Sequence, residues 1–369
     1  MNNAVHLKRE RNSAVELLRI VAMMFIVMSH CSVYGDFPTV SSKFPFNSYF
    51  LDWISLGNVG VDLFLMISGY FLSAKEFRIQ SIIKLLAQVL FFSYLCLAVS
   101  CLAGNAVSKW TIIRAVFPTI TSVYWFFSAY MVLLLLSPFI NIFVKNASGK
   151  QLFSCLSIMM ALWSILPTIT DITMYGADLP QFVMFYLLGA YLKKYPDNVL
   201  RVPKFRRWLI VCSAVLLFAS SAILRSLNDH VLTSYIFERK YYGRTSVFVV
   251  GLAIGMFSTA VYHKPWSNKF VNTIASCTFG VYLFHDNPLI RAMLWPVWVN
   301  NTPFYDSQVL IPRVLLSVVI VYVGCTLIEL LRQKFFVKPL EYLLEKVYGF
   351  CSRILKRGAI ALQTMHEHE

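Results

Sequence analysis

The sequence predicts an all-α integral membrane protein, a bundle of about ten transmembrane helices with both termini in the cytoplasm. Hydrophobic residues make up 58% of the 369 residues and charged residues only 14%, a balance that soluble domains do not have. The apolar residues are gathered into runs of about 20, the length that crosses the hydrocarbon core of a bilayer. The loops between these runs differ in their content of Lys and Arg, which predicts the orientation of the chain.

Ten runs are long and apolar enough to be spans. They cover residues 14–34, 53–74, 81–103, 122–144, 151–169, 179–195, 208–226, 245–262, 272–299 and 309–331. With the N-terminus inside, most of the 33 Lys and Arg residues fall in the inner loops and the tail. This bias predicts a multi-pass protein of the cell inner (cytoplasmic) membrane. It also explains the net charge of +15 through topology and anionic lipid, so we expect the lipid bilayer and no nucleic acid as a partner.

The chain divides into three parts: a cytoplasmic segment at 1–12, the membrane domain at 13–333 and a cytoplasmic tail at 334–369. In the tail, apolar residues can line one side of a helix while Lys and Arg lie elsewhere, which predicts a C-terminal amphipathic helix on the membrane surface. The first apolar run lacks a small-residue cleavage site, so no cleavable signal peptide is expected. The 8 cysteines include no C-x-x-C pair, which favours neither a disulfide framework nor a metal site.

The first span, AVELLRIVAMMFIVMSHCSVY, carries three ionisable residues: Glu16, Arg19 and His30. Arg19 and His30 are 11 residues apart, which returns to nearly the same helix face about 16 Å further along the axis. The three residues therefore form one polar stripe. Ionisable groups inside a membrane usually serve a function. The alternative for Glu16 and Arg19 is that they reach the nearby headgroups.

The second span places Asp62 at mid-membrane, with Asn58 and Gly69 on about the same face. A carboxyl group at that depth pairs, takes up a proton or lines a wet cavity; a hydrogen bond to a neighbouring helix is an equal alternative. Gly57, Gly60 and Gly69 can permit close helix approach.

A basic cluster follows where the chain turns at the inner face. It consists of Lys75, Arg78 and Lys84. These positive charges are explained if they only fix the orientation of the chain in the membrane. Alternatively, they bind the phosphate groups of a ligand.

Two outer features are candidates for contact with a glycan. Trp125 opens the fourth span and fits an interfacial aromatic belt, or else a platform on which a sugar ring stacks. The segment 225–244 is polar, aromatic and basic; it could contact an acceptor or be a solvated loop.

The ninth span carries FGVYLFHDNPLIR. Counted from Lys269 at the inner face, His285 lies roughly 24 Å along the helix, in the outer half, where His30 is also expected. Asn287 and Pro288 should break or kink the helix beside this histidine. A His-Asp-Asn run at a helix break indicates a site or a polar cap; alternatively, Asp286 and Asn287 simply begin the outer loop.

Four stretches in this order resemble the membrane-bound acyltransferase family 3 (polysaccharide O-acetyltransferase type). They are Arg19 with His30 in the first span, GVDLFLMISGYFL in the second, YWFFSAYMVLLLLSPFIN in the fourth and FGVYLFHDNPLIR in the ninth. The resemblance covers most of residues 13–333. It implies about ten spans and an enzyme that moves an acyl group, usually acetyl from acetyl-CoA. The acceptor implied is a hydroxyl of a cell-surface polysaccharide or its lipid-linked precursor, and no metal is expected.

By this resemblance, His30 is the catalytic histidine and Arg19 its partner. Many relatives carry a paired-arginine motif just after the second span, and the approximate counterparts here are Lys75, Arg78 and Lys84. These residues, with or without Arg19, would bind the phosphates of acyl-CoA.

Neutral His30 would act as a general base on the acceptor hydroxyl or accept the acyl group itself; the sequence leaves both open. Asp62 or His285 would orient it. Trp125, Asp286 and Asn287 would contact the acceptor.

A transporter or flippase for a lipid-linked glycan is the alternative function, because buried Arg, Asp and His also suit proton coupling or substrate passage. No obvious repeat relates the two halves of the chain, which disfavours this alternative. The sequence makes no prediction of the oligomeric state.

Overall fold

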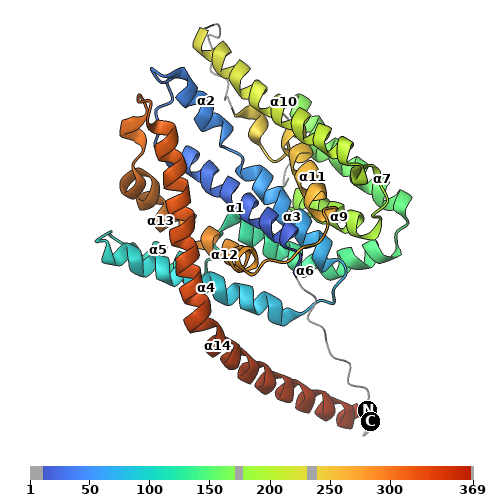
Figure 1. Cartoon of the computed structure of the whole chain (residues 1–369). Helices are drawn as coiled ribbons and strands as arrows, with labels where there is room; N and C mark the ends of the chain where they lie inside the picture. The colour runs from blue at the N-terminus through green and yellow to red at the C-terminus, as the bar shows by residue number, and fades with distance from the viewer. Residues whose placement is uncertain (1–10, 171–177, 231–238, 367–369) are drawn as a thin grey trace.

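Every regular element of the part of the chain that the structure describes is a helix (Figure 1), which confirms the all-α class. The structure is a computed structural model that describes residues 11–170, 178–230 and 239–366. Its elements are α1 (Ser13–Tyr34), α2 (Pro45–Trp53), α3 (Gly57–Leu72), α4 (Ile79–Leu102), α5 (Lys109–Val116), α6 (Trp125–Asn146), α7 (Gly149–Met160), η1 (Ala161–Ile165), α8 (Leu166–Thr170), α9 (Asp178–Lys194), η2 (Val199–Arg201), α10 (Pro203–His230), η3 (Lys240–Tyr242), α11 (Val247–Val261), α12 (Lys269–His285), α13 (Pro288–Met293), η4 (Leu294–Val299), η5 (Thr302–Phe304) and α14 (Leu310–His366).

Eight helical stretches within the described ranges are long and apolar enough to cross a bilayer. They are α1, α4, α6, α10, the first part of α14, and three stretches of joined elements: α2 with α3, α7 with α8, and η3 with α11. They coincide with eight of the ten predicted runs. The other two runs correspond to α9 and α12, which have 17 residues each. At 1.5 Å per residue this is about 26 Å, slightly less than the hydrocarbon core of about 30 Å. The count of ten spans stays a prediction.

The centre of the bundle is α3, which packs against α1, α9 and α11. The span formed by α2 and α3 is 78% buried within the protein, whereas those of α7 with α8 and of α10 are 22% buried. Apolar side chains on the outer helices remain exposed, among them Phe153, Ile223 and Leu316. A bilayer rather than water is the solvent that these faces suit.

Glycines allow α3 to approach both neighbours closely, as the sequence predicts. A Cβ atom on Gly60 would overlap the backbone carbonyl of Ala22 in α1, and one on Gly69 would overlap the carbonyl of Tyr186 in α9. On the α9 side, a Cβ on Gly189 would in turn overlap the backbone of α3. Small residues at such contacts let helix backbones touch and gain van der Waals packing.

The two ends of the membrane part share one face of the bundle, called here the N-terminal face; the opposite one is the far face. Ser13 begins α1 at the N-terminal face, where its N–H donates to the Trp266 carbonyl (2.8 Å) and its hydroxyl to Asn272 (2.8 Å). Late in α14, Gln333 donates to the carbonyl of Ser276 in the same half of α12 (3.2 Å). Assignment of this face to the cytoplasm stays a prediction.

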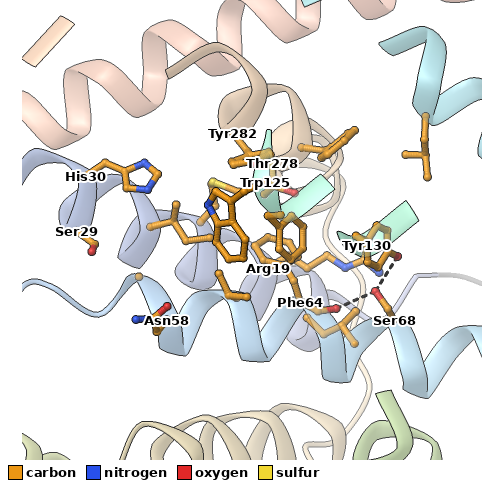
Figure 2. A pocket seen from close by; sticks show the side chains of 18 residues that line it. Arg19, Ser29, His30, Asn58, Phe64, Ser68, Trp125, Tyr130, Thr278 and Tyr282 are labelled. Carbon is orange, nitrogen blue, oxygen red and sulfur yellow. Dashed lines mark hydrogen bonds between the residues drawn. The ribbon is translucent and has the colours of Figure 1, made fainter. Parts of the chain in front are cut away.

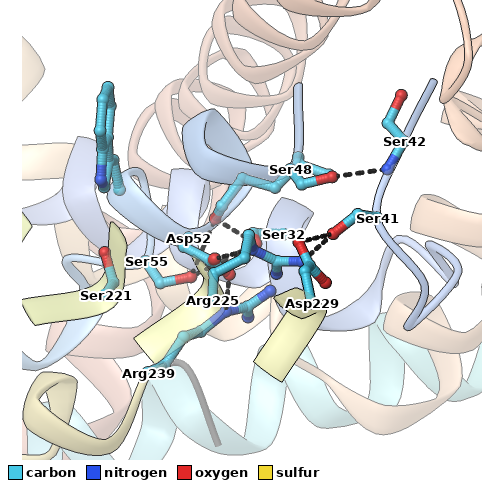
Figure 3. Close-up of polar contacts among 12 residues, drawn as sticks. Ser32, Ser41, Ser42, Ser48, Asp52, Ser55, Ser221, Arg225, Asp229 and Arg239 are labelled. Atoms are coloured by element: carbon cyan, nitrogen blue, oxygen red, sulfur yellow. Dashed lines mark hydrogen bonds and ion pairs between the residues drawn. The ribbon is translucent and has the colours of Figure 1, made fainter. Parts of the chain in front are cut away.

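A buried ion-pair cluster closes the far face (Figure 3). Asp52 of α2 accepts from Nε of Arg225 in α10 at 2.7 Å and from Nε of Arg239 at 3.0 Å. Ser41, which donates to Asp229 (2.7 Å), joins the loop before α2 to α10. These parts of the segment 225–244 therefore hold helices together; residues 231–238 lie outside the described ranges.

The helix α14 is continuous from Leu310 to His366 and passes through the predicted boundary at 333/334 without a break. Its last part runs on beyond the other helices (Figure 1). The side chains from residue 340 onward lie outside the description, so the amphipathic character of this part stays a prediction.

We expect Gly69→Ala to lower the free energy of unfolding by about 1–3 kcal/mol, the usual cost of overpacking, because α3 and α9 must separate to admit the new methyl group. Thermal unfolding of the protein in detergent measures this. Gly324→Ala is the matched control, since nothing lies within 4 Å of a Cβ there and alanine favours a helix over glycine. Equal unfolding temperatures for the two variants would contradict the packing argument.

Candidate active site

Two histidines from distant parts of the chain meet near the far end of α1. The two helices are tied at the N-terminal face, where the Asn268 N–H donates to the Ser13 hydroxyl (2.7 Å). His30 follows Ser13 by as many residues as His285 follows Asn268. Because α1 and α12 pack together and rise equally per residue, the two rings arrive at the same depth. Nδ1 of His30 lies 3.0 Å from Nε2 of His285.

The hydrogen bonds assign the protons on both rings. Nδ1 of His285 lies 2.6 Å from the carbonyl oxygen of Val281, which can only accept, so this nitrogen carries the hydrogen. In its neutral form, Nε2 of His285 is then an acceptor, and Nδ1 of His30 donates to it. Neutral His30 therefore keeps its lone pair on Nε2.

A carboxylate and a guanidinium complete the cluster. Asp286 directly follows α12, and its Oδ1 lies 3.5 Å from Nδ1 of His30 and 3.0 Å from Nη1 of Arg291. The guanidinium of Arg291 also covers the ring of Tyr34 at 4.1 Å. A second acceptor thus faces the N–H of His30, while Arg291 neutralises part of the buried negative charge.

The helix break after His285 positions this cluster, as the sequence predicts. The side chain of Asn287 accepts from the Leu289 N–H (3.0 Å) and caps α13; Pro288 occupies the first turn, where its missing N–H costs nothing. The amide of Asn287 also donates to the Tyr124 hydroxyl (2.8 Å), which donates to the Leu283 carbonyl (2.9 Å). Asn287 is buried in these bonds, so the structure places it as the support of the turn and not against the His30 ring.

The His30 ring borders a cavity of about 290 Å³ between α1, α3, α4, α6 and α12. Figure 2 shows His30 at one end and Ser68 with Tyr130, hydrogen-bonded at 2.9 Å, at the other. The remaining polar members of the lining are Arg19, Ser29, Asn58, Trp125, Thr278 and Tyr282. Apolar side chains make up the rest, so the cavity suits a long, mostly apolar group with a few polar contacts.

Arg19 and His30 border the same cavity, as expected of the polar stripe, but they do not touch. About 16 Å separates them along α1. Arg19 lies 3.9 Å from the carboxylate of Glu16 and 5.9 Å from the ring centre of Phe71. Its Nε is buried and has no hydrogen-bond partner among the described residues. Arg19 therefore offers a donor at the N-terminal end of the cavity, remote from the histidine pair.

Asp62 is completely buried, and neither carboxyl oxygen has a hydrogen-bond partner among the described residues. It is not part of the cavity lining. Of the two residues expected to orient His30, the one in contact is His285.

Of the remaining predicted residues, Trp125 lines the cavity, whereas the basic residues after α3 are not among its lining residues. Lys75, Arg78 and Lys84 are exposed around the turn from α3 to α4, and Leu85, directly after Lys84, contributes to the lining. Trp125 begins α6, lines the cavity and is 40% exposed. The guanidinium of Arg244, paired with Asp178, lies over its indole at 4.6 Å.

Sequence reasoning missed the contacts that Arg291 and Tyr124 make in the site. Both stood in stretches that were already singled out: Arg291 ends the run FHDNPLIR, and Tyr124 precedes Trp125. A cation five residues after an intramembrane Asp was the available signal, because a buried carboxylate needs a partner.

Asn287→Ala should lower the free energy of unfolding by about 1–3 kcal/mol, because it removes a helix cap and the donor to a buried tyrosine. Asn287→Asp keeps the capping oxygen and should cost less. Thermal unfolding in detergent compares them, with Ser148→Ala as the control, since it removes an exposed cap of α7 far from the site. If Asn287→Ala unfolds no earlier than Ser148→Ala, the bond to Tyr124 does not support the turn.

Comparison with known proteins gives one match. The sequence model of a protein family described as an acyltransferase domain matches residues 12–330. Neither the curated proteins nor the solved structures include a match to the chain.

Proposed function

This chain belongs to acyltransferase family 3 and is a membrane acyltransferase; we propose that it moves an acetyl group from cytoplasmic acetyl-CoA to a hydroxyl of a cell-surface polysaccharide or its lipid-linked precursor. The observation that carries the proposal is the unprotonated Nε2 of His30 at the edge of a membrane cavity, with its other nitrogen held by His285 and Asp286.

In this proposal, Nε2 of His30 takes the proton of the acceptor hydroxyl as the oxygen attacks the thioester carbonyl carbon. The carbon–sulfur bond then breaks, the ester forms, and the imidazolium returns the proton to the leaving thiolate, so that CoA departs as a free thiol. Such a positioned base contributes about 10²–10⁴-fold to a rate.

The cluster around His30 supports the base role over a role as acyl carrier. When His30 becomes an imidazolium, its Nδ1–H points at the neutral acceptor of His285 and lies 3.5 Å from the carboxylate of Asp286. Both contacts offer an acceptor to this N–H, and the ring orientation is fixed before the substrate binds.

The donor is proposed to enter from the N-terminal face. Arg19 would bind a phosphate oxygen of the donor with its guanidinium, which lines the cavity, and Lys75, Arg78 and Lys84 would hold the other phosphates near the mouth. The apolar stretch between Arg19 and His30 would hold the extended pantetheine arm. The acceptor would approach from the far face, beside Trp125 and Asp286.

The first test is mass spectrometry of the surface glycan from cells that express wild type or His30→Ala at equal membrane levels. We expect an acetyl increment with wild type and a loss of about 10²-fold or more with His30→Ala, because the base is absent. His263→Ala is the control, since His263 lies in the exposed turn after α11. Normal acylation by His30→Ala would refute the mechanism. Export of the glycan without added acyl mass would instead favour a transporter.

The positioning role of His285 is tested by two variants that differ in their ability to form these hydrogen bonds. The amide of His285→Gln can accept from His30 and donate to Val281, whereas His285→Phe can do neither. With purified enzyme, we expect kcat to fall about 10²-fold for Phe and much less for Gln, with KM for the donor nearly unchanged in both. Equal losses of kcat would show that His285 serves only packing.

A further inference from the structure

A second cavity, of about 630 Å³, opens at the N-terminal face between α3, α9, α10 and α11. Three cations contribute to its lining, Lys193 at the end of α9, Arg201 in η2 and Arg206 in α10, and two rings flank them, Tyr70 of α3 and Tyr262 after α11. These three positive side chains surround one cavity, and they repel one another unless an anion lies between them.

The cations are held in place by neutral groups. Arg206 is only 8% exposed; its Nη1 donates to the carbonyls of Leu200 (2.7 Å) and Arg201 (2.8 Å), and its guanidinium lies 5.6 Å from the ring centre of Tyr262. Lys193 lies 4.7 Å from the ring centre of Tyr70. Within the described ranges, neither cation forms an ion pair with a carboxylate.

Among the described residues, one cation of the lining has an acidic partner. Asp197 pairs with Arg201, and both are largely exposed. The cluster of Lys193, Arg201, Arg206 and Asp197 therefore keeps a net charge of about +2 near neutral pH. The hydroxyl of Tyr262 accepts from the amide of Asn198 (2.8 Å), which leaves its own hydrogen for a further acceptor.

This cavity is separate from the one that His30 borders. The two share no lining residue. Ser68 lines the first and Tyr70 the second, and two residues correspond to about 200° around α3. These residues therefore lie on opposite sides of α3, and the second cavity does not include His30.

We propose that the second cavity binds the phosphate of an anionic phospholipid headgroup at the membrane surface. Its place at the ends of four helices puts the cations at headgroup depth, where basic pockets between transmembrane helices select anionic lipids. One phosphodiester would compensate part of the excess charge, and Arg201 with Lys193 would supply its donors. The volume lies in the range of small-ligand pockets. The proposal is independent of the acyl transfer proposed above.

The test measures the binding of short-chain phosphatidylglycerol and phosphatidylcholine to the full-length protein in detergent, by the concentration dependence of its unfolding temperature. We expect wild type to prefer phosphatidylglycerol. The double variant Lys193→Gln/Arg201→Gln should bind phosphatidylglycerol about 30-fold more weakly, because each lost charge lowers the affinity about fivefold. Its affinity for phosphatidylcholine should equal that of wild type.

The matched control is Lys204→Gln/Arg207→Gln, which removes two exposed positive charges from the same region but outside the cavity; it should keep the preference. Equal losses in both double variants would overturn the proposal, because the attraction would then be a diffuse surface charge. If the wild-type protein binds phosphatidylglycerol and phosphatidylcholine equally well, the proposal is also overturned. Inorganic phosphate or 3′,5′-ADP that displaces phosphatidylglycerol and binds as tightly would identify a site for soluble phosphates and refute the lipid assignment.

Discussion

The pairing of α1 with α12 is the contact on which the site depends. Bonds between Ser13 and Asn268 fix the register of the two helices at the N-terminal face, and equal rise carries His30 and His285 to one depth at the other end. A shift of either helix by one residue would move a ring by about 1.5 Å along the axis and about 100° around it. A polar bond at one end of the helix pair thus sets the geometry at the opposite end.

The break after α12 gives Asp286 its charge partner. Asp286 still makes the helical backbone bond to the Tyr282 carbonyl (3.1 Å), so the last turn of α12 itself places its carboxylate beside His30. The chain turns at the next residue, Asn287, which caps a new helix that Pro288 begins. Arg291, one turn into the new segment, pairs with Asp286. Here the turn itself supplies the partner of a buried carboxylate, which lowers the cost of placing that charge in a membrane.

The basic residues of the chain serve distinct purposes according to depth. Arg225 and Arg239 pair with Asp52 and join α2 to α10, whereas Arg19 keeps a donor without a partner within the described ranges. At the N-terminal face, Lys193 and Arg206 rest on aromatic rings and carbonyls. A net charge of +15 therefore combines structural ion pairs with cations that remain open to anions.

The sequence by itself determined the helical membrane class, the extent of most spans, the glycine contacts of α3 and the helix break at Asn287, because apolar run length, small residues and proline act locally. It also placed His30 and His285 at similar depth, since rise along a helix is fixed. Only the tertiary structure decided that His285 and Asp286, and not Asp62, contact His30, because the rotation of one helix against another depends on packing over the whole bundle. The role of Asn287 also depends on the tertiary structure. Its local sequence suits either a helix cap or a substrate contact, and the hydrogen bond to Tyr124 shows that it supports the turn.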